Sequence, residues 1–327
     1  MAAPSPVAPF TTATAVRKVT GNSWSATLVQ DYCVGAVPNG GYVGSILHQV
    51  VSQHFSAQGQ RQDIISAQLQ YLNRTQVGEA TIVIEDVKRG RATSTIHATL
   101  LQPGPSSAAE QQRKCILAYF VCAAPSPNGL TLATGWTLHP PPPPVDLDRV
   151  AAGLDPNWSS TAGRVQTSHL AAVGFVRHVE SVLESFYRRE PARKGLDDVW
   201  LRLTTGERFT NATLPLVADA KPYVVERWRP SPAEDGAEEE EAGPFPSKEA
   251  FWYPTLVMNL DIKKLLPPEG VEWLFLRTEA RMIDQGRLDL QVYILDQHGD
   301  LIALASHINL IVSAARNLGT KGGKGRL

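Results

Sequence analysis

Two distant segments of the chain share one pattern of alternating residues. After Gly90-Arg91, one face holds small or apolar side chains, namely Ala92, Ser94, Ile96, Ala98 and Leu100, and polar residues alternate with them. After Gly286-Arg287, the corresponding face holds Leu288, Leu290, Val292 and Ile294. A period of two is typical of a half-buried strand. Because both copies keep the same phase relative to the glycine, the pattern predicts a duplicated domain.

A different period predicts a helix over residues 39–55. Its apolar positions are spaced i, i+3, i+4, i+7 and i+8, at Val43, Ile46, Leu47, Val50 and Val51. The opposite face carries the polar residues Ser45, His48, Gln49 and Ser52. Asn39 supplies an N-cap, and the glycines after it allow a close approach of another chain segment.

The remaining pattern predicts strands after each of two helices. In the first half, strands are expected near residues 64–73, 80–89, 91–102 and 113–123. The second half shows an apolar segment near 170–187, a strand ending at Arg202, and a helix near 214–227. Its later strands are expected at 252–262, 272–283, 287–296 and 300–313. A helix followed by consecutive antiparallel strands is an α+β layout in which the helix covers one sheet face.

Proline and charge divide the chain into two domains. Five prolines at 140–144 favour a stiff extended spacer, so residues 136–164 are expected to form a Pro-rich linker. The predicted domains are then residues 15–135 and 165–315. An acidic, proline-flanked stretch at 230–250 should be a solvated loop of the second domain. The Gly/Lys-rich tail from Gly319 should lack regular structure.

Composition argues against several classes of protein. Hydrophobic residues make up 43% of the chain and the net charge is -1, which suits a globular protein and gives no basic footprint for nucleic acid. No apolar run approaches the roughly 20 residues of a membrane span. The first residues lack a secretory signal pattern, so a cytoplasmic protein is expected. The ending Lys324-Gly325-Arg326-Leu327 is similar to a peroxisomal address and leaves that compartment as the alternative.

No motif points to a metal or a bound cofactor. The three cysteines have no zinc spacing, and the chain lacks His-Glu-x-x-His. It also lacks the glycine patterns of dinucleotide and P-loop sites. We therefore expect neither metal nor cofactor, although an adenine nucleotide could still enter as part of coenzyme A.

Five short motifs together carry a family resemblance. In order they are Pro38-Asn39-Gly40-Gly41-Tyr42, Lys88-Arg89-Gly90-Arg91, Ala218-Asp219, Tyr253-Pro254-Thr255-Leu256, and Gln297-His298-Gly299-Asp300-Leu301-Ile302-Ala303. Over residues 20–313 the chain resembles the double-hotdog acyl-CoA thioesterases, in the thioesterase-like superfamily related to bacterial acyl-CoA thioesterase II. The resemblance implies two tandem hotdog domains, each a long central helix wrapped by an antiparallel sheet.

The resemblance also implies a water-activating trio. In thioesterase II these residues are an Asp, a Thr and a Gln, and their positions correspond to Asp219, Thr255 and His307. The histidine departs from the family, as does Val257, where an Asp usually follows the Thr. Because histidine titrates near neutral pH, we expect His307 to be able to take a proton that Gln cannot.

Elementary chemistry suggests how these groups would act on a thioester. Asp219 near a helix start should stay an anion that holds water, and Thr255 can complete the water's hydrogen bonds. Backbone N–H groups at the other helix start are natural oxyanion donors. The expected substrate-binding and oxyanion residues are Asn39, Gly40, Gly41 and Tyr42.

Three functions remain open from the sequence. The first is an acyl-thioester hydrolase acting on acyl-CoA or on carrier-bound acyl or polyketide chains. The second is a dehydratase, hydratase or cyclase on the same scaffold, in which His307 would move a substrate proton. The third is a non-catalytic protein that binds acyl or polyketide chains. The expected partner is an acyl thioester of CoA or acyl carrier protein, and the chain could also form a homo-oligomer.

Overall fold

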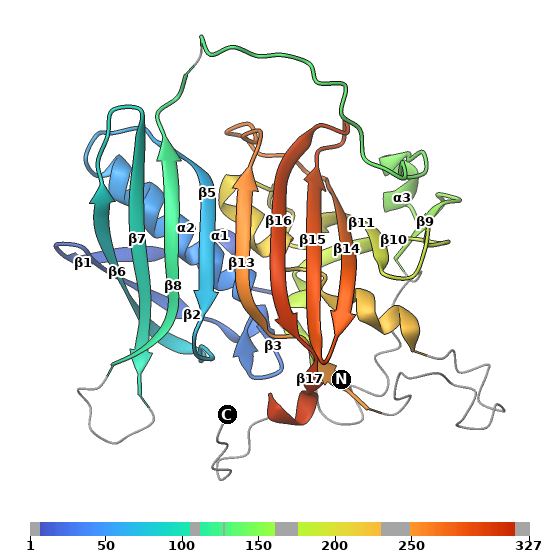
Figure 1. The fold of residues 1–327 in the computed structure, drawn as a ribbon, viewed down its shortest axis with the longest axis horizontal. Coiled ribbons are helices and arrows are strands. Elements are labelled where there is room, and N and C mark those ends of the chain that lie inside the picture. The colour runs from blue at the N-terminus through green and yellow to red at the C-terminus, as the bar shows by residue number, and fades with distance from the viewer. Residues whose placement is uncertain (1–6, 105–111, 127, 161–175, 230–248, 318–327) are drawn as a thin grey trace.

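A single antiparallel sheet runs through both halves of the chain (Figure 1). The computed structural model describes residues 7–104, 112–126, 128–160, 176–229 and 249–317. The sheet has 13 strands in the order β1-β2-β6-β7-β8-β5-β13-β16-β15-β14-β11-β10-β9. The first half contributes β1 (Val16–Thr20), β2 (Ser23–Leu28), β5 (Asp63–Tyr71), β6 (Gly78–Lys88), β7 (Thr93–Pro103) and β8 (Gln112–Ala123).

The second half supplies the other seven strands. They are β9 (Trp158–Ser159), β10 (Leu183–Arg188), β11 (Leu196–Leu203), β13 (Thr255–Ile262), β14 (Leu274–Asp284), β15 (Arg287–Leu295) and β16 (Leu301–Leu310). β5 and β13 pair antiparallel at the centre, with Leu69 opposite Met258 and Ala67 opposite Leu260. The two halves therefore share one continuous sheet through main-chain hydrogen bonds.

The strand order confirms the duplication expected from the repeated pattern. Outward from the centre, β5, β8, β7 and β6 mirror β13, β16, β15 and β14. The two Gly-Arg segments form β7 and β15, which therefore occupy equivalent places. Their predicted faces are also confirmed, since Ile96 and Ala98 of β7 and Leu290 and Val292 of β15 are buried.

Two helices lie on one face of the sheet, where the halves meet (Figure 1). α2 (Gly40–Ser56) agrees with the predicted helix, and Asn39 Oδ1 caps it by accepting from Tyr42 N at 2.9 Å. On the polar face of α2, Ser45 and His48 are buried. The second-half helix packs against this side of α2, and Leu216 N donates to Ser45 Oγ at 3.3 Å.

The second helix is shorter than its apolar pattern predicted. α5 (Leu214–Ala218) ends before Asp219, and a separate 3-10 segment, η4 (Tyr223–Trp228), follows. The break has a local cause, because Pro222 has no N–H to donate and disfavours helical geometry at the residue before it. The expected helix over 214–227 is therefore two short helices with Asp219 in the turn between them.

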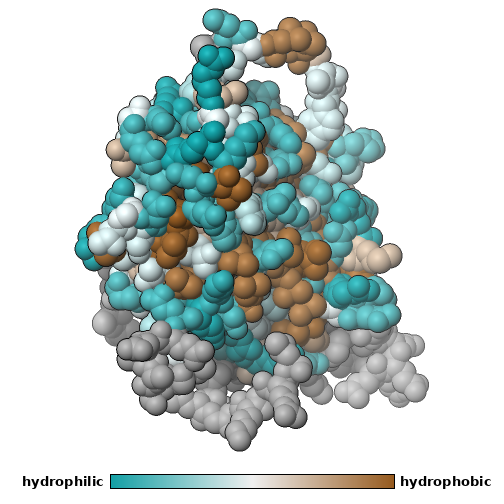
Figure 2. Space-filling model, turned by 60° about the vertical axis from the view of Figure 1, so that its left-hand side comes forward, coloured by the Kyte–Doolittle hydropathy of each residue, from teal (hydrophilic) through white to brown (hydrophobic). Residues whose placement is uncertain are grey.

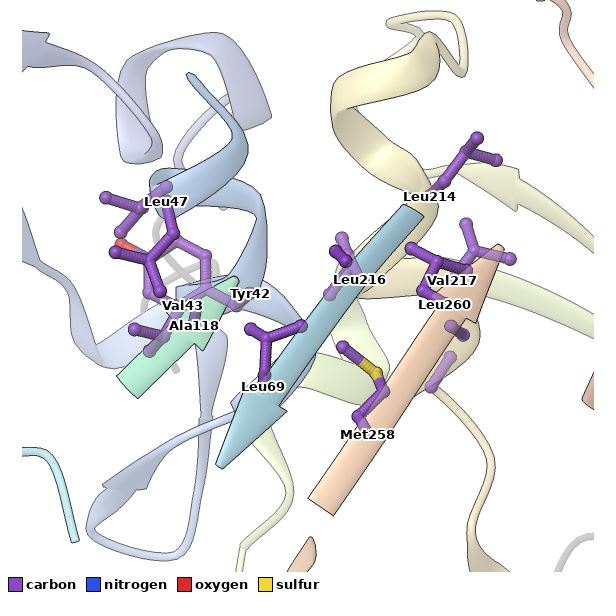
Figure 3. Packing of buried hydrophobic residues seen from close by; sticks show 14 of the residues in the cluster. Tyr42, Val43, Leu47, Leu69, Ala118, Leu214, Leu216, Val217, Met258 and Leu260 are labelled. Atoms are coloured by element: carbon purple, nitrogen blue, oxygen red, sulfur yellow. The ribbon is translucent and has the colours of Figure 1, made fainter. Parts of the chain in front are cut away.

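Glycine and apolar side chains bring α2, α5 and the central strands together. Figure 3 shows Val43 and Leu47 of α2 in the same buried cluster as Leu69 of β5 and Met258 of β13. A Cβ at Gly41 would lie only 2.2 Å from Pro215 O, so the crossing of the helices requires glycine there. The core thus fixes the start of α2 against the end of α5.

The proline-rich connection arches over one edge of the molecule (Figures 1 and 2). Pro140 O accepts from Arg277 Nη1 at 2.6 Å, and Arg277 also pairs with Asp198 at 2.6 and 2.8 Å. Arg277 and Asp198 are both buried, so their ion pair fixes the Arg277 side chain. Through its bond to Pro140, Arg277 then anchors the connection to the second half. Leu130 and Leu132, earlier in the connection, are largely exposed.

Short elements complete the described fold. They are α1 (Phe10–Ala13), α3 (Leu147–Ala151), β3 (Cys33–Val34), β4 (Val37–Pro38), β12 (Phe251–Trp252), β17 (Val312–Ser313), and the 3-10 segments η1 (Gln30–Tyr32), η2 (His178–Ser181), η3 (Asn211–Thr213) and η6 (Ala314–Arg316). None of the described helices is long and apolar enough to cross a membrane. The predictions for residues 170–175, for 230–248 of the acidic loop and for the tail from Gly319 lie outside the described residues.

Candidate active site

A cavity of about 250 Å³ opens where the start of α2 meets the second half. Its apolar walls come from both halves and comprise Val34, Val37, Val43, Ile116, Leu256, Leu310 and Val312. Its polar groups include Asn39, Gly40 and Tyr71 from the first half and Asp219 and Thr255 from the second. A concave, mostly apolar site with a few convergent polar groups is the usual form of a small-molecule site.

The carboxylate of Asp219 joins the two halves at this cavity. Its Oδ2 accepts from Gly41 N at 2.9 Å and from Asn39 Nδ2 at 3.0 Å. Its Oδ1 accepts from Thr255 Oγ1 at 2.9 Å. The carboxylate is therefore held by donors from the first-half helix and from strand β13, although these residues are far apart in the sequence.

The helix start that stabilises Asp219 is not that of its own helix. We expected Asp219 near the beginning of the second helix, but it caps the C-terminal end of α5. Its carboxylate instead reaches the first amides of α2, where the helix dipole is positive. The expectation failed because the sequence pattern could not show that α5 ends at Ala218.

Burial makes Asp219 a stronger base than an ordinary carboxylate. The pKa of Asp219 is raised from 3.8 to about 6, because burial penalises the charged form, while the bonds from Thr255, Gly41 and Asn39 act in the opposite direction. A base near this value is largely ionised at neutral pH and accepts a proton more readily than an exposed carboxylate. The carboxylate thus remains the ionised acceptor expected from the sequence, and its raised pKa makes it a better base than that expectation assumed.

Asn309, which the sequence analysis did not select, orients the Thr255 hydroxyl. Asn309 is fully buried, and its Nδ2 donates to Thr255 Oγ1 at 2.9 Å. The hydroxyl accepts this bond and so donates its own hydrogen to Asp219 Oδ1. The available signal was its place two residues after His307 in β16, since residues i and i+2 of a strand share a face.

His307 lies behind the carboxylate and not on the cavity wall. Its Nδ1 is 3.7 Å from Asp219 Oδ1, and its ring is buried. Neither ring nitrogen has a hydrogen-bond partner among the described residues. Burial lowers the pKa of His307 to about 4, so the ring is neutral at neutral pH. The structure thus brings Asp219, Thr255 and His307 together, but only Asp219 and Thr255 line the cavity.

The residues expected to bind the oxyanion are arranged differently from the expectation. The Gly41 N–H donates to Asp219 and is not directed at an empty oxyanion site. Tyr42 is turned away from the cavity, since its hydroxyl donates to Ala13 O at 2.7 Å and its ring stacks on Tyr32. Asn39 and Gly40 do line the cavity. The dipole of α2 is therefore used chiefly to hold the Asp219 carboxylate.

Tyr71 is a second site residue that the sequence analysis missed. Its hydroxyl donates to Gly40 O at 3.0 Å, and its ring packs where a Cβ at Gly40 would lie. Burial raises its pKa well above the usual value, so the phenol stays protonated. Tyr71 therefore fixes the turn that presents the start of α2 to the cavity.

The described side chains offer no obvious place for a metal ion. Among the described residues there is no group of three or more His, Cys, Asp and Glu side chains suited to one.

Comparison with known families agrees with this architecture. Residues 28–123 match the model of an acyl-CoA thioesterase N-terminal domain, and residues 144–311 match that of an acyl-CoA thioesterase C-terminal domain. The chain belongs to this thioesterase family. The chain is also similar to the thioesterase-like protein TwmA of Talaromyces wortmannii. The two sequences are 33% identical over 342 residues, and the alignment covers 97% of this chain and 96% of TwmA.

Solved structures of low sequence identity show the same fold. A hot dog fold protein from Alicyclobacillus acidocaldarius superposes with a TM-score of 0.66 and 15% identity, over 93% of this chain and 97% of that one. The acyl-CoA thioesterase II TesB2 of Mycobacterium marinum gives a TM-score of 0.59 and 14% identity, over 93% and 98% of the chains. The α+β double hotdog expected from the sequence is therefore confirmed.

Proposed function

We propose that this protein is an acyl-thioester hydrolase acting on acyl-CoA or on a carrier-bound acyl or polyketide chain. The observation that supports this most strongly is the Asp219 carboxylate, held at the start of α2 beside the apolar cavity. An acyl chain would lie along the apolar walls, with its thioester carbonyl near Asp219. Membership of the thioesterase family supports this choice of substrate.

In the proposed reaction, Asp219 activates a water molecule. The water oxygen attacks the thioester carbonyl carbon while Oδ1 takes one of the water's protons. The carbon–sulfur bond then breaks, and the departing thiolate receives the proton back, so that the products are a carboxylic acid and a thiol. Of the two carboxylate oxygens, Oδ1 accepts the single bond from Thr255 and has the freer lone pair.

Thr255 and Asn309 hold that water in place. The Thr255 oxygen accepts from Asn309 and donates to Asp219, which leaves its other lone pair for the water. Asn309 thus acts through Thr255 and is a positioning residue. A fixed water and a fixed acceptor lower the entropic cost of the attack.

We propose that His307 tunes the carboxylate and does not contact the water. A neutral ring next to Asp219 adds no positive charge that would lower the pKa of the carboxyl group. The buried ring lies beside Oδ1, with Nδ1 at 3.7 Å. In this account the residue stays in the site, although in a different role from the general base expected from the sequence.

Release of thiol from a panel of acyl thioesters tests the proposal. A hydrolase should produce stoichiometric thiol and free acid, and the Asp219→Asn variant should form both about 10²–10⁴-fold more slowly. Conversion of an unsaturated or hydroxylated acyl chain without thiol release would favour the dehydratase, hydratase or cyclase alternative. A chain that binds tightly and is recovered unchanged would favour the binding protein.

A further inference from the structure

We propose that Arg74 and Arg316 form a phosphate-binding subsite at the mouth of the cavity, which takes the phosphate of a phosphopantetheine arm. This inference rests on the proposed function and adds the group that the protein recognises on the thiol side of the thioester. Both arginines line the cavity and are exposed, whereas Asp219 lines it and is buried. The arginines therefore mark the open end and the carboxylate marks the reacting end.

The charge at this mouth is unbalanced. Of the described residues that line the cavity, Arg74 and Arg316 are cationic and only Asp219 is anionic. Within the described chain neither arginine forms an ion pair, whereas Arg277, Arg281 and several other arginines do. Two guanidinium groups without a carboxylate partner favour a bound anion, and guanidinium geometry matches phosphate.

The Arg74 side chain is fixed in advance. Its guanidinium lies over the Trp252 ring at 4.9 Å, and its Nη1 donates to the backbone oxygen of Arg316. Arg113 Nη2 donates to Arg74 O at 2.8 Å and holds the backbone. Because one N–H is used, the others of the planar group stay available to a ligand. Such preorganisation reduces the entropy lost on binding.

Arg316 is held by a different part of the first half. The residue after it, Asn317, is buried, and its side chain donates to Val34 O at 2.8 Å and accepts from Ala36 N at 3.0 Å. Burial, together with a smaller repulsion from the Arg316 guanidinium group, lowers the pKa of Arg74. Arrival of a phosphate would relieve this repulsion.

The apolar walls between the two ends suit the pantetheine arm. Leu72 and Trp252, which are not among the walls assigned to the acyl chain, line the cavity together with the two arginines and would offer apolar contacts to a slender uncharged chain between the mouth and Asp219. CoA and the prosthetic group of an acyl carrier protein both carry a phosphate at the end of such an arm. The subsite would therefore recognise the shared phosphate in either source.

A substrate series with one acyl chain tests the subsite. The kcat/KM is measured for the thioesters of CoA, 4′-phosphopantetheine, pantetheine and N-acetylcysteamine, with the wild type and with Arg74→Gln and Arg316→Gln. We expect each variant to lose roughly tenfold in kcat/KM on the two phosphorylated substrates, and little on the other two. Arg61 is an exposed arginine outside this cavity, and Arg61→Gln removes the same charge. This control should leave the kcat/KM for all four thioesters unchanged.

The outcomes separate this inference from the proposed function. Equal losses on phosphorylated and unphosphorylated substrates, or no preference of the wild type for phosphate, would overturn the subsite while leaving hydrolysis intact. If no thioester is cleaved at all, competition binding of desulfo-CoA against desulfopantetheine still tests the subsite, and a phosphate preference lost in Arg74→Gln would support it. A higher kcat/KM for acyl carrier protein than for CoA would identify the carrier as the source, and the reverse would identify CoA.

Discussion

Replacing Asp219 by Asn should abolish most of the activity and yet stabilise the protein at neutral pH. Burial raises the pKa of this carboxyl group from 3.8 to about 6, so the folded state is penalised when the group is ionised. Such a rise corresponds to about 3 kcal/mol at most. The penalty is absent below the pKa that the Asp219 carboxyl group has in the unfolded chain. It grows between about pH 4 and pH 6 and is complete above that range.

Asparagine avoids this penalty and keeps the shape of the side chain. Its amide oxygen can still accept from Gly41 and Asn39, and its amide group can face Thr255. We therefore expect the free energy of unfolding at pH 7 to rise by up to about 3 kcal/mol, with the gain vanishing near pH 4. The kcat/KM should fall about 10²–10⁴-fold, because the base is lost.

Urea unfolding at pH 4 and pH 7, together with thioester hydrolysis, measures both effects. Asp261→Asn is a matched control, because this carboxylate also lies on β13 but is half-exposed and pairs with Lys263. It should change neither quantity appreciably. The wild-type kcat/KM should fall as the pH drops below about 6. Loss of stability at pH 7 on Asp219→Asn, or retention of more than a tenth of the activity, would contradict the role assigned to this buried carboxylate.

Other substitutions test separate parts of the structure. Thr255→Val removes a hydrogen-bond donor to the Asp219 carboxylate, so kcat/KM should fall about tenfold or more and the low-pH limb of the pH profile should shift to higher pH. A limb at the wild-type pH would contradict the role assigned to the hydroxyl. Gly41→Ala places a Cβ 2.2 Å from Pro215 O and should cost about 3 kcal/mol or more of unfolding free energy, whereas Gly44→Ala, with contacts of 3.2 Å, should cost clearly less. Arg277→Leu leaves the buried Asp198 undercompensated and should cost about 3 kcal/mol; a neutral result by urea unfolding would show that the pair is dispensable.

The fold could be predicted because its signals are local and repeated. The alternation after Gly90 and Gly286 places β7 and β15 with the correct faces buried. The apolar spacing and the Asn39 cap place α2 within a residue or two. Each signal depends only on residues close together in the sequence, so the sequence alone is enough to predict these elements.

The details of the site depend on contacts that no local pattern contains. The pattern could not show that α5 would cover Ser45 and His48, because that contact joins the two halves. Apolar residues continue past Asp219, so the pattern predicted one long helix, although Pro222 breaks it. The raised pKa of Asp219 likewise follows from burial between the halves.

Asn309 shows where the sequence held a usable signal. It lies in an otherwise apolar strand and shares a face with His307, which the family resemblance had already selected. A buried side-chain amide is usually hydrogen-bonded, and the Asn309 amide donates to Thr255 Oγ1. By contrast, nothing in the sequence places Arg74 next to Arg316, since their contact depends on the complete fold.

We propose that a water molecule, positioned by Asp219 between the two halves, cleaves an acyl thioester. The most direct test is a single turnover in H₂¹⁸O, with mass analysis of the acid product and of the protein. Attack by the positioned water should give free thiol, one heavy oxygen in the released acid, and no label in Asp219. Label in the Asp219 carboxylate would show direct attack by that residue, and an acyl thioester recovered intact would contradict hydrolysis altogether.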